Sequence, residues 1–76
     1  MNRNEFYAEI ETIVDRDSGS IKGPERLADL EAWDSLAVLS FIALADAKFG
    51  ASLTAESLIS CQTVDDLAGL FPGKIS

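Results

Sequence analysis

Residues 36–49 form the most apolar stretch of the chain, with three polar members: Ser40, Asp46 and Lys48. A helix of this composition is apolar on nearly every side and needs neighbouring elements to cover it. Asp34 stands before the stretch and can accept hydrogen bonds from the free N–H groups of a first turn, while Gly50 follows it as a typical helix end. The pattern predicts a central helix. It is shorter than the roughly 18 uninterrupted apolar residues of a membrane span.

An amphipathic period precedes the central helix. Apolar residues recur at i, i+4, i+7 and i+8, namely Phe6, Ile10, Ile13 and Val14. Acidic residues occupy the other faces, namely Glu5, Glu9, Glu11 and Asp15. Asn2 followed by Glu5 resembles a capping box, and Asp-Ser-Gly-Ser at 17–20 contains helix breakers. We predict a first helix over residues 3–16.

A long connection, residues 17–33, joins these two helices. Connections longer than about 12–15 residues are usually functional or ordered by their own side chains. Leu27, Leu30 and Trp33 follow Pro24 at intervals of three and can pin the connection over the core. Packing is the favoured role of Trp33, and contact with a partner is the alternative.

Two further helices are predicted after the central one. Thr54 can cap a short helix that carries Leu58 and Ile59, and Thr63 can cap a last helix. Asp65 and Asp66 in the first turn of the last helix interact favourably with the positive end of the helix dipole. Its apolar period is Val64, Leu67, Ala68 and Phe71. The Pro-Gly pair at 72–73 should end it and leave a short loose tail to Ser76.

These patterns predict an all-α bundle of three main helices and one short helix. The central helix should bury Phe41, Ile42, Ala45 and Phe49. Facing them we expect Phe6, Ile10 and Ile13 from the first helix, with Val64 and Leu67 from the last. With 76 residues, the chain should form one domain over 1–76 and have little surface for a deep catalytic cleft.

Charge and composition narrow the class of protein. The net charge of −7 repels nucleic acid and anionic membranes and favours basic protein partners, so we expect no nucleic-acid partner. We also expect the protein to be a monomer. The chain has no histidine and a single cysteine, which suits a reducing, cytoplasmic setting and predicts no metal site. The N-terminal residues lack the apolar region of a secretory signal.

Candidate chemistry is confined to one hydroxyl. Because the chain lacks histidine, a Ser-His-Asp triad is impossible, and we predict that the protein is not an enzyme. Asp34-Ser35-Leu36 places a hydroxyl in the first turn of the central helix, where the helix dipole and free N–H groups stabilise a phosphodiester. The alternative is that Asp34 and Ser35 only cap the helix.

The wider context of Ser35 is more specific. Asp-Ser-Leu, an apolar helix ending in Lys-Phe-Gly, Ser-Leu-Thr-Ala-Glu-Ser-Leu and Thr-Val-Asp-Asp-Leu together resemble the acyl carrier protein family over nearly the whole chain. The resemblance implies an acyl-carrier-like four-helix bundle with a long first loop. It also implies that a magnesium-dependent phosphopantetheinyl transferase attaches 4′-phosphopantetheine from coenzyme A to Ser35. The thiol of this arm would hold an acyl group as a thioester, presented to acyl-loading and acyl-processing enzymes or sheltered inside the bundle.

The resemblance also assigns roles around Ser35. Asp34 would serve transferase recognition, with a helix cap alone as the alternative. Leu36 and Leu39 would dock partners, with burial in the core as the alternative. Cys61 falls where the family has an apolar residue, which implies a small buried side chain rather than a reactive thiol.

The chain departs from the family pattern at two places. Carriers for ordinary fatty acid synthesis have an acid-rich second helix, whereas Asp46 is the one acid in the corresponding helix here. Trp33 replaces the small residue common before Asp-Ser-Leu. Trp33 and Asp46 are therefore further docking candidates, and a specialised fatty acid, polyketide or nonribosomal peptide pathway is favoured. A small acidic helical adaptor without a prosthetic group is the alternative function.

Overall fold

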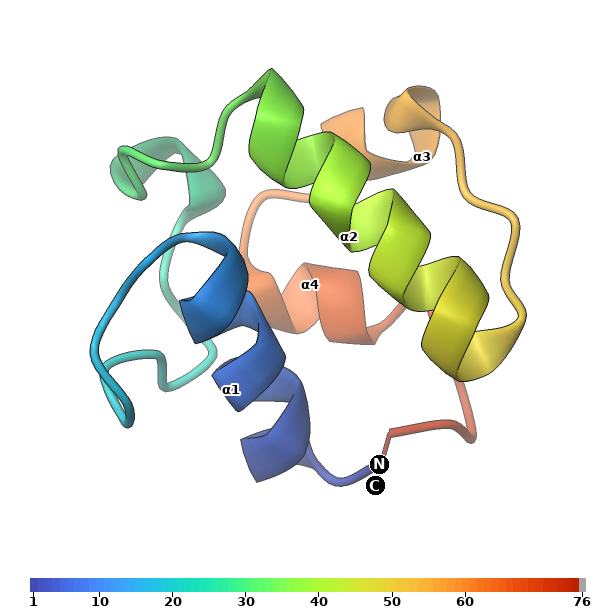
Figure 1. Ribbon diagram of the computed structural model, residues 1–76, viewed down its shortest axis with the longest axis horizontal. Coiled ribbons are helices and arrows are strands. Elements are labelled where there is room, and N and C mark those ends of the chain that lie inside the picture. Colours follow the sequence, from blue (N-terminus) through green and yellow to red (C-terminus); the bar gives the residue numbers. More distant parts are fainter. Residues whose placement is uncertain (76) are drawn as a thin grey trace.

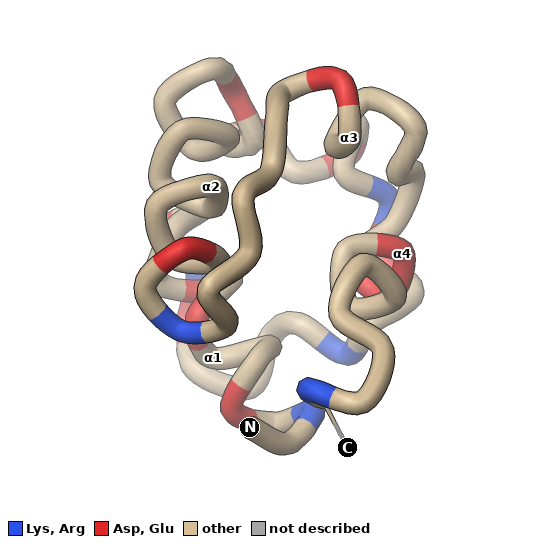
Figure 2. Tube along the Cα trace, turned by 90° about the vertical axis from the view of Figure 1, so that its right-hand side faces the viewer, with Lys and Arg blue, Asp and Glu red and all other residues tan. Residues whose placement is uncertain are grey.

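The computed structural model describes residues 1–75, which contain four α-helices, a 3-10 helix and no β-strand. In chain order these are α1 (Arg3–Ile13), η1 (Leu27–Asp29), α2 (Ser35–Phe49), α3 (Ala55–Ile59) and α4 (Val64–Ala68). α2 crosses the molecule with α1 on one side and α3 along the other (Figure 1), and Figure 2 shows α2 and α4 on opposite sides. The predicted all-α, acyl-carrier-like four-helix bundle is confirmed.

The helices begin at the capping residues that the sequence predicted. Asn2 and Glu5 form a capping box, in which the Glu5 N–H donates to Asn2 Oδ1 at 2.8 Å and the Asn2 N–H donates to Glu5 Oε1 at 3.0 Å. Thr54 caps α3, and Thr63 forms a second capping box with Asp66 at the start of α4. Because these bonds join residues three positions apart, the local sequence suffices to place each start.

Two helices end earlier than predicted. α1 ends at Ile13 rather than near residue 16, because Asp15 adopts a left-handed conformation with φ 55°. α4 ends at Ala68, and the N–H groups of Leu70 and Phe71 then bond to carbonyls three residues back. The bundle therefore has two long and two short helices, although Phe71 still reaches the core.

Aromatic side chains fill the core between α1, α2 and α4. Phe6 and Phe41 are fully buried and meet edge to face with ring centroids 6.1 Å apart. Phe71 packs against both, with centroid distances of 6.5 Å to Phe6 and 6.0 Å to Phe41. The two contacts of Phe6 are edge to face, which is favourable for aromatic quadrupoles, and the centre of the bundle is occupied by rings.

Most of the predicted core residues are buried, namely Phe6, Ile10, Phe41, Ala45, Val64 and Leu67. Ile13, Ile42 and Phe49 are instead only half-buried and pack on the edge of the core. Val14 is buried in the position that was expected for Ile13. Phe6, Ile10 and Val14 are spaced by four residues, so they lie on the same face of the helix, which faces the bundle.

The long connection is ordered, as predicted, by buried leucines and by backbone pairing. Leu27 and Leu30 are buried, and the Leu27 N–H donates to the Gln62 carbonyl at 2.8 Å. The N–H groups of Val64 and Asp65 donate to carbonyls of residues 25 and 23 at 3.1 and 2.9 Å. Carbonyls of the connection therefore satisfy the N–H groups that open α4.

Glu11 holds the start of the same connection. The sequence pattern placed it on a polar face, but it is buried, and its carboxylate accepts the Ile21 N–H at 3.0 Å. A buried carboxylate needs such a donor, and the donor becomes available only when the connection folds back over α1.

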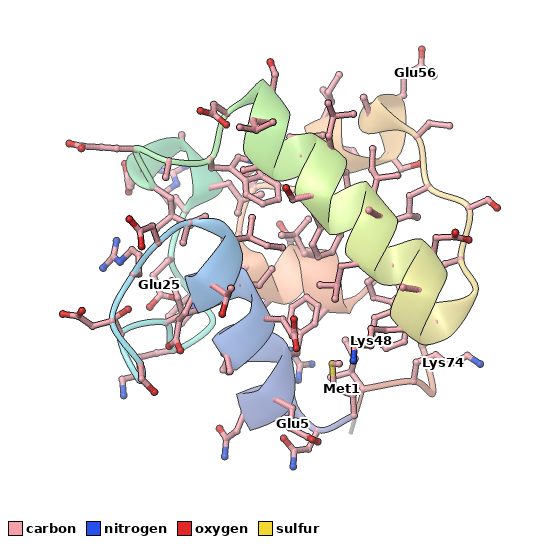
Figure 3. All side chains as sticks on the ribbon, viewed as in Figure 1. Met1, Glu5, Glu25, Lys48, Glu56 and Lys74 are labelled. Atoms are coloured by element: carbon pink, nitrogen blue, oxygen red, sulfur yellow. The ribbon has the colours of Figure 1, made fainter. Side chains whose placement is uncertain are left out.

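The N-terminus lies close to residue 74. The Met1 ammonium donates to the Lys74 carbonyl at 3.5 Å, and both residues lie at one end of the molecule in Figure 3. Ile75 packs against the edge of the core, so residues 74 and 75 are not the loose tail that was predicted. Ser76, the last residue of that predicted tail, lies outside the described residues.

Candidate functional site

Ser35 is the first residue of α2, and its side chain is exposed. Asp34 precedes it in an extended conformation and caps the helix, because its carboxylate accepts the Ala37 N–H at 3.0 Å. The side-chain hydrogen bonds formed within residues 1–75 do not include the Ser35 hydroxyl. The structure thus presents a free hydroxyl at the positive end of the longest helix.

An open groove of about 470 Å³ lies beside Ser35, between the start of α2 and α3. Its lining residues are Trp33, Asp34, Ser35, Val38, Leu39, Ala55, Leu58 and Ile59. The fold therefore brings together four of the predicted site residues: Trp33, Asp34, Ser35 and Leu39. Leu36 and Asp46 are not among the residues that line the groove.

Trp33 joins this groove to the core. Its indole is half-buried and stands edge-on to Phe41, with ring centroids 6.0 Å apart and an interplanar angle of 68°. The predicted packing role is confirmed, and the same side chain forms one wall of the groove.

Three large apolar side chains near Ser35 are exposed: Leu36 at 72%, Leu39 at 62% and Ile59 at 80%. The structure excludes core burial, the alternative considered for the two leucines. Ile59 was missed as a surface residue. The length of α3 could have indicated it, since two adjacent apolar residues on a five-residue helix point in different directions, and Leu58 is the one that is buried.

Asp46 lies near the far end of α2 and is exposed. It follows Ser35 by eleven residues, about 16 Å along a helix at ~1.5 Å per residue. Figure 2 shows α2 free of charge for most of its length, with its charges near the C-terminal end. The surface of α2 itself is therefore uncharged next to Ser35, and the exposed acid that borders it is the capping residue Asp34.

Cys61 is half-buried, less than the resemblance implied. Burial, and then the charge of Asp66, raises the pKa of the Cys61 thiol. Cys61 therefore remains a neutral thiol at ordinary pH, in keeping with a packing residue. Within residues 1–75, no group of three or more potential side-chain ligands is arranged to hold a metal ion.

Comparison with known proteins agrees with this geometry. The small helical bundle, with a free serine hydroxyl at the head of its central helix, has the features of a carrier domain. The family model described as a phosphopantetheine attachment site matches residues 4–71. The chain therefore belongs to this acyl carrier protein-like family, whose prosthetic group is 4′-phosphopantetheine and whose domains act as non-catalytic carriers. No curated protein and no solved structure matched the chain.

Among the described residues, no helix has both the length and the apolar character needed to cross a bilayer.

Proposed function

We propose that Ser35 is the attachment point of 4′-phosphopantetheine and that a phosphopantetheinyl transferase installs it from coenzyme A. The observation that carries this assignment is the exposed Ser35 hydroxyl at the first position of α2, free of side-chain hydrogen bonds within residues 1–75. A phosphodiester there gains from the helix dipole, typically about 0.3–1 kcal/mol for an exposed charge. Asp34 holds the first turn in place, and we assign it transferase recognition as well.

The described residues fit the prosthetic group. The hydroxyl can be esterified without breaking a side-chain hydrogen bond within the described chain, and the groove beside it has room for an attached chain. When bound, the group supplies a terminal thiol that carries acyl or related intermediates as thioesters. This chain's own residues then position the attachment point and present a surface to other enzymes.

On this proposal, residues 1–76 act as one monomeric carrier domain in the cytoplasm, and chemistry on the cargo belongs to acyl-loading and acyl-processing enzymes. The domain serves a specialised fatty acid, polyketide or nonribosomal peptide pathway. The uncharged surface of α2 near Ser35 supports this assignment, since the acid-rich second helix of ordinary fatty acid carriers is missing.

Partner docking is assigned to the apolar side chains around Ser35. Leu36 and Leu39 are exposed on the first two turns of α2, so a partner that approaches Ser35 can bury both. The exposed part of the Trp33 indole extends this docking surface at its edge. Asp46 contributes a single negative charge at the far end of α2. Burying an apolar side chain fully contributes about 1.5–3 kcal/mol, more than an exposed ion pair.

The test is an intact-mass measurement after incubation with coenzyme A, magnesium and a broad-specificity phosphopantetheinyl transferase. We expect a gain of one phosphopantetheine unit. Ser35→Ala should abolish the gain, whereas Ser40→Ala should keep it, because Ser40 is an exposed serine on the same helix but away from its N-terminus. If the folded protein keeps its mass with several active transferases, the proposal fails and the adaptor function is favoured.

A further inference from the structure

Aromatic rings separate the groove wall at Trp33 from the centre of the core. Trp33 stands over Phe41, which is fully buried and packs in turn against Phe6 and Phe71. Close-packed rings leave no room for an additional chain unless they move. A group attached at Ser35 can lie against Trp33 in the groove without displacing these rings.

The groove on that outer face suits an apolar group. Its volume of about 470 Å³ falls in the range typical of small-molecule sites, roughly 300–1,000 Å³. Its walls include Trp33, Val38, Leu39, Leu58 and Ile59. Leu39 and Ile59 stand at the rim with most of their surface in water, so an apolar group that settles between them removes this surface from solvent.

The charges near the groove disfavour a carboxylate. No lysine or arginine lines it, and Asp34, whose carboxylate is bound to a helix N–H, is the one ionisable residue among its lining residues. Glu56 on α3 points outward nearby (Figure 3), and the chain as a whole carries a net charge of −7. A carboxylate in the groove would lose hydration without gaining a cation.

We infer that the acyl group carried by this protein rests outside the helical core, in the groove walled by Trp33, and that the groove holds uncharged apolar acyl groups in preference to carboxylated ones. The inference rests on the proposed attachment of the arm to Ser35. It makes Trp33 a positioning residue that keeps the cargo on the surface.

Trp33 is the single tryptophan of the chain, so tryptophan fluorescence reports on this one side chain in the groove wall. Ser35 is loaded by transferase from coenzyme A, from octanoyl-coenzyme A and from the ω-carboxylated thioester of the same chain length, and each product is verified by intact mass. In the octanoyl form we expect Trp33 emission to move to shorter wavelength and acrylamide quenching to fall, relative to the form with a free thiol. The carboxylated form should match the free-thiol form.

Two leucines on the same helix provide a matched control. Leu39→Ala removes a wall of the groove and should reduce the emission shift, whereas Leu36→Ala should keep it, because Leu36 lies outside the groove. Nuclear magnetic resonance of the octanoyl form should show its largest changes at Leu58 and Ile59, not at the rings of Phe6 and Phe71.

The outcomes separate the two proposals. If the mass shows an octanoyl arm on Ser35 but Trp33 does not respond, or if the core rings change most, the groove is not the resting place and the attachment stands. An equal response to the carboxylated arm overturns the stated preference. If no mass is gained at Ser35, the proposed function fails and this inference fails with it.

Discussion

The Tyr7 hydroxyl on α1 donates a 2.6 Å hydrogen bond to Oδ1 of Asp65 on α4, and this pair lies directly over Gly23 in the long connection. The Arg3 guanidinium donates to the same oxygen at 2.9 Å. Burial raises the pKa of Tyr7, and the bond to Asp65 raises it further, since a phenolate would lose that bond and face a carboxylate. Two helices and the connection thus meet at one point.

Gly23→Ala should destabilise the protein because this meeting point has no room for a side chain. A Cβ at Gly23 would lie 2.5 Å from both Tyr7 Oη and Asp65 Oδ1, and the backbone there has φ +116°. Backbone strain of this kind costs about 1–3 kcal/mol, and the displaced hydrogen bond adds about 0.5–1.5 kcal/mol. Urea unfolding followed by circular dichroism measures the loss.

Gly19→Ala is the matched control for Gly23→Ala. Gly19 also has a positive φ, +83°, but a Cβ there has nothing within 4 Å. It should therefore show only the backbone part of the loss. In a Tyr7→Phe background, which lacks the hydrogen bond, the difference between the two alanine variants should shrink. Equal losses for the two variants in the wild-type background would contradict the steric argument.

Phe41→Ala should cost more stability than Phe49→Ala. Phe41 is fully buried among aromatic rings, and removing such a ring costs about 3–5 kcal/mol, a large share of the roughly 5–15 kcal/mol that stabilises a typical domain. Phe49 stacks on Phe71 at 4.4 Å but is only half-buried, so its ring leaves a smaller cavity. Denaturant midpoints of both variants give the comparison. A larger loss for Phe49→Ala would show that the centre of the core has been misplaced.

The capping carboxylate of Asp66 should make stability depend on pH. Backbone N–H groups of Gln62 and Thr63 donate to it at 2.9 and 3.1 Å and lower its pKa from the ordinary 3.8. The unfolded chain therefore takes up this proton first as the pH falls. The stabilisation is complete above pH 3.8 and is lost as the pH falls through the lower pKa of the folded state.

Asp66→Asn removes the charge and tests this dependence. The variant should be less stable than the wild type at pH ~7, and the difference should shrink as the pH falls through the lowered pKa of Asp66. Urea midpoints measured across this range provide the comparison. A difference that stays constant with pH would mean that the shape of the side chain matters and its charge does not.

Docking of partners should depend more on Leu36 than on Asp46. An apolar anchor that becomes fully buried contributes about 1.5–3 kcal/mol, so Leu36→Ala should slow charging by a cognate acyl-loading enzyme roughly 10- to 100-fold. Asp46→Asn should change the rate by a factor of about 5 or less, since exposed ion pairs contribute about 0–1 kcal/mol. The rates are measured on the phosphopantetheinylated variants, after circular dichroism has shown that both are folded.

Salt separates the two modes of docking. The Leu36 effect should persist at moderate ionic strength, because apolar contacts are not screened, whereas any Asp46 effect should weaken. A large Asp46 effect that disappears with salt, beside little loss for Leu36→Ala, would mean that this carrier recognises partners electrostatically.

The sequence by itself determined where the helices begin and where the candidate attachment point lies. Asn2, Asp34, Thr54 and Thr63 each accept an N–H three residues further along. Such bonds close within one turn, so they can be recognised in the sequence without the rest of the chain. Because Asp34 caps α2, Ser35 is the first residue of that helix. The candidate attachment point and the family resemblance could therefore be recognised from short motifs.

Tertiary structure alone decided what each side chain faces. Glu11 is buried, and its carboxylate accepts the N–H of Ile21, ten residues away. The N–H groups at the start of α4 donate to carbonyls of the long connection, some forty residues earlier. Ile59 is exposed and Leu58 buried because α3 packs against the start of α2 in one orientation. The groove beside Ser35 has the same origin, since its walls come from segments that meet only after folding. Hydrophobic burial has no direction of its own, so a pattern can say that a residue is apolar, but only packing decides whether it fills the core or lines a surface.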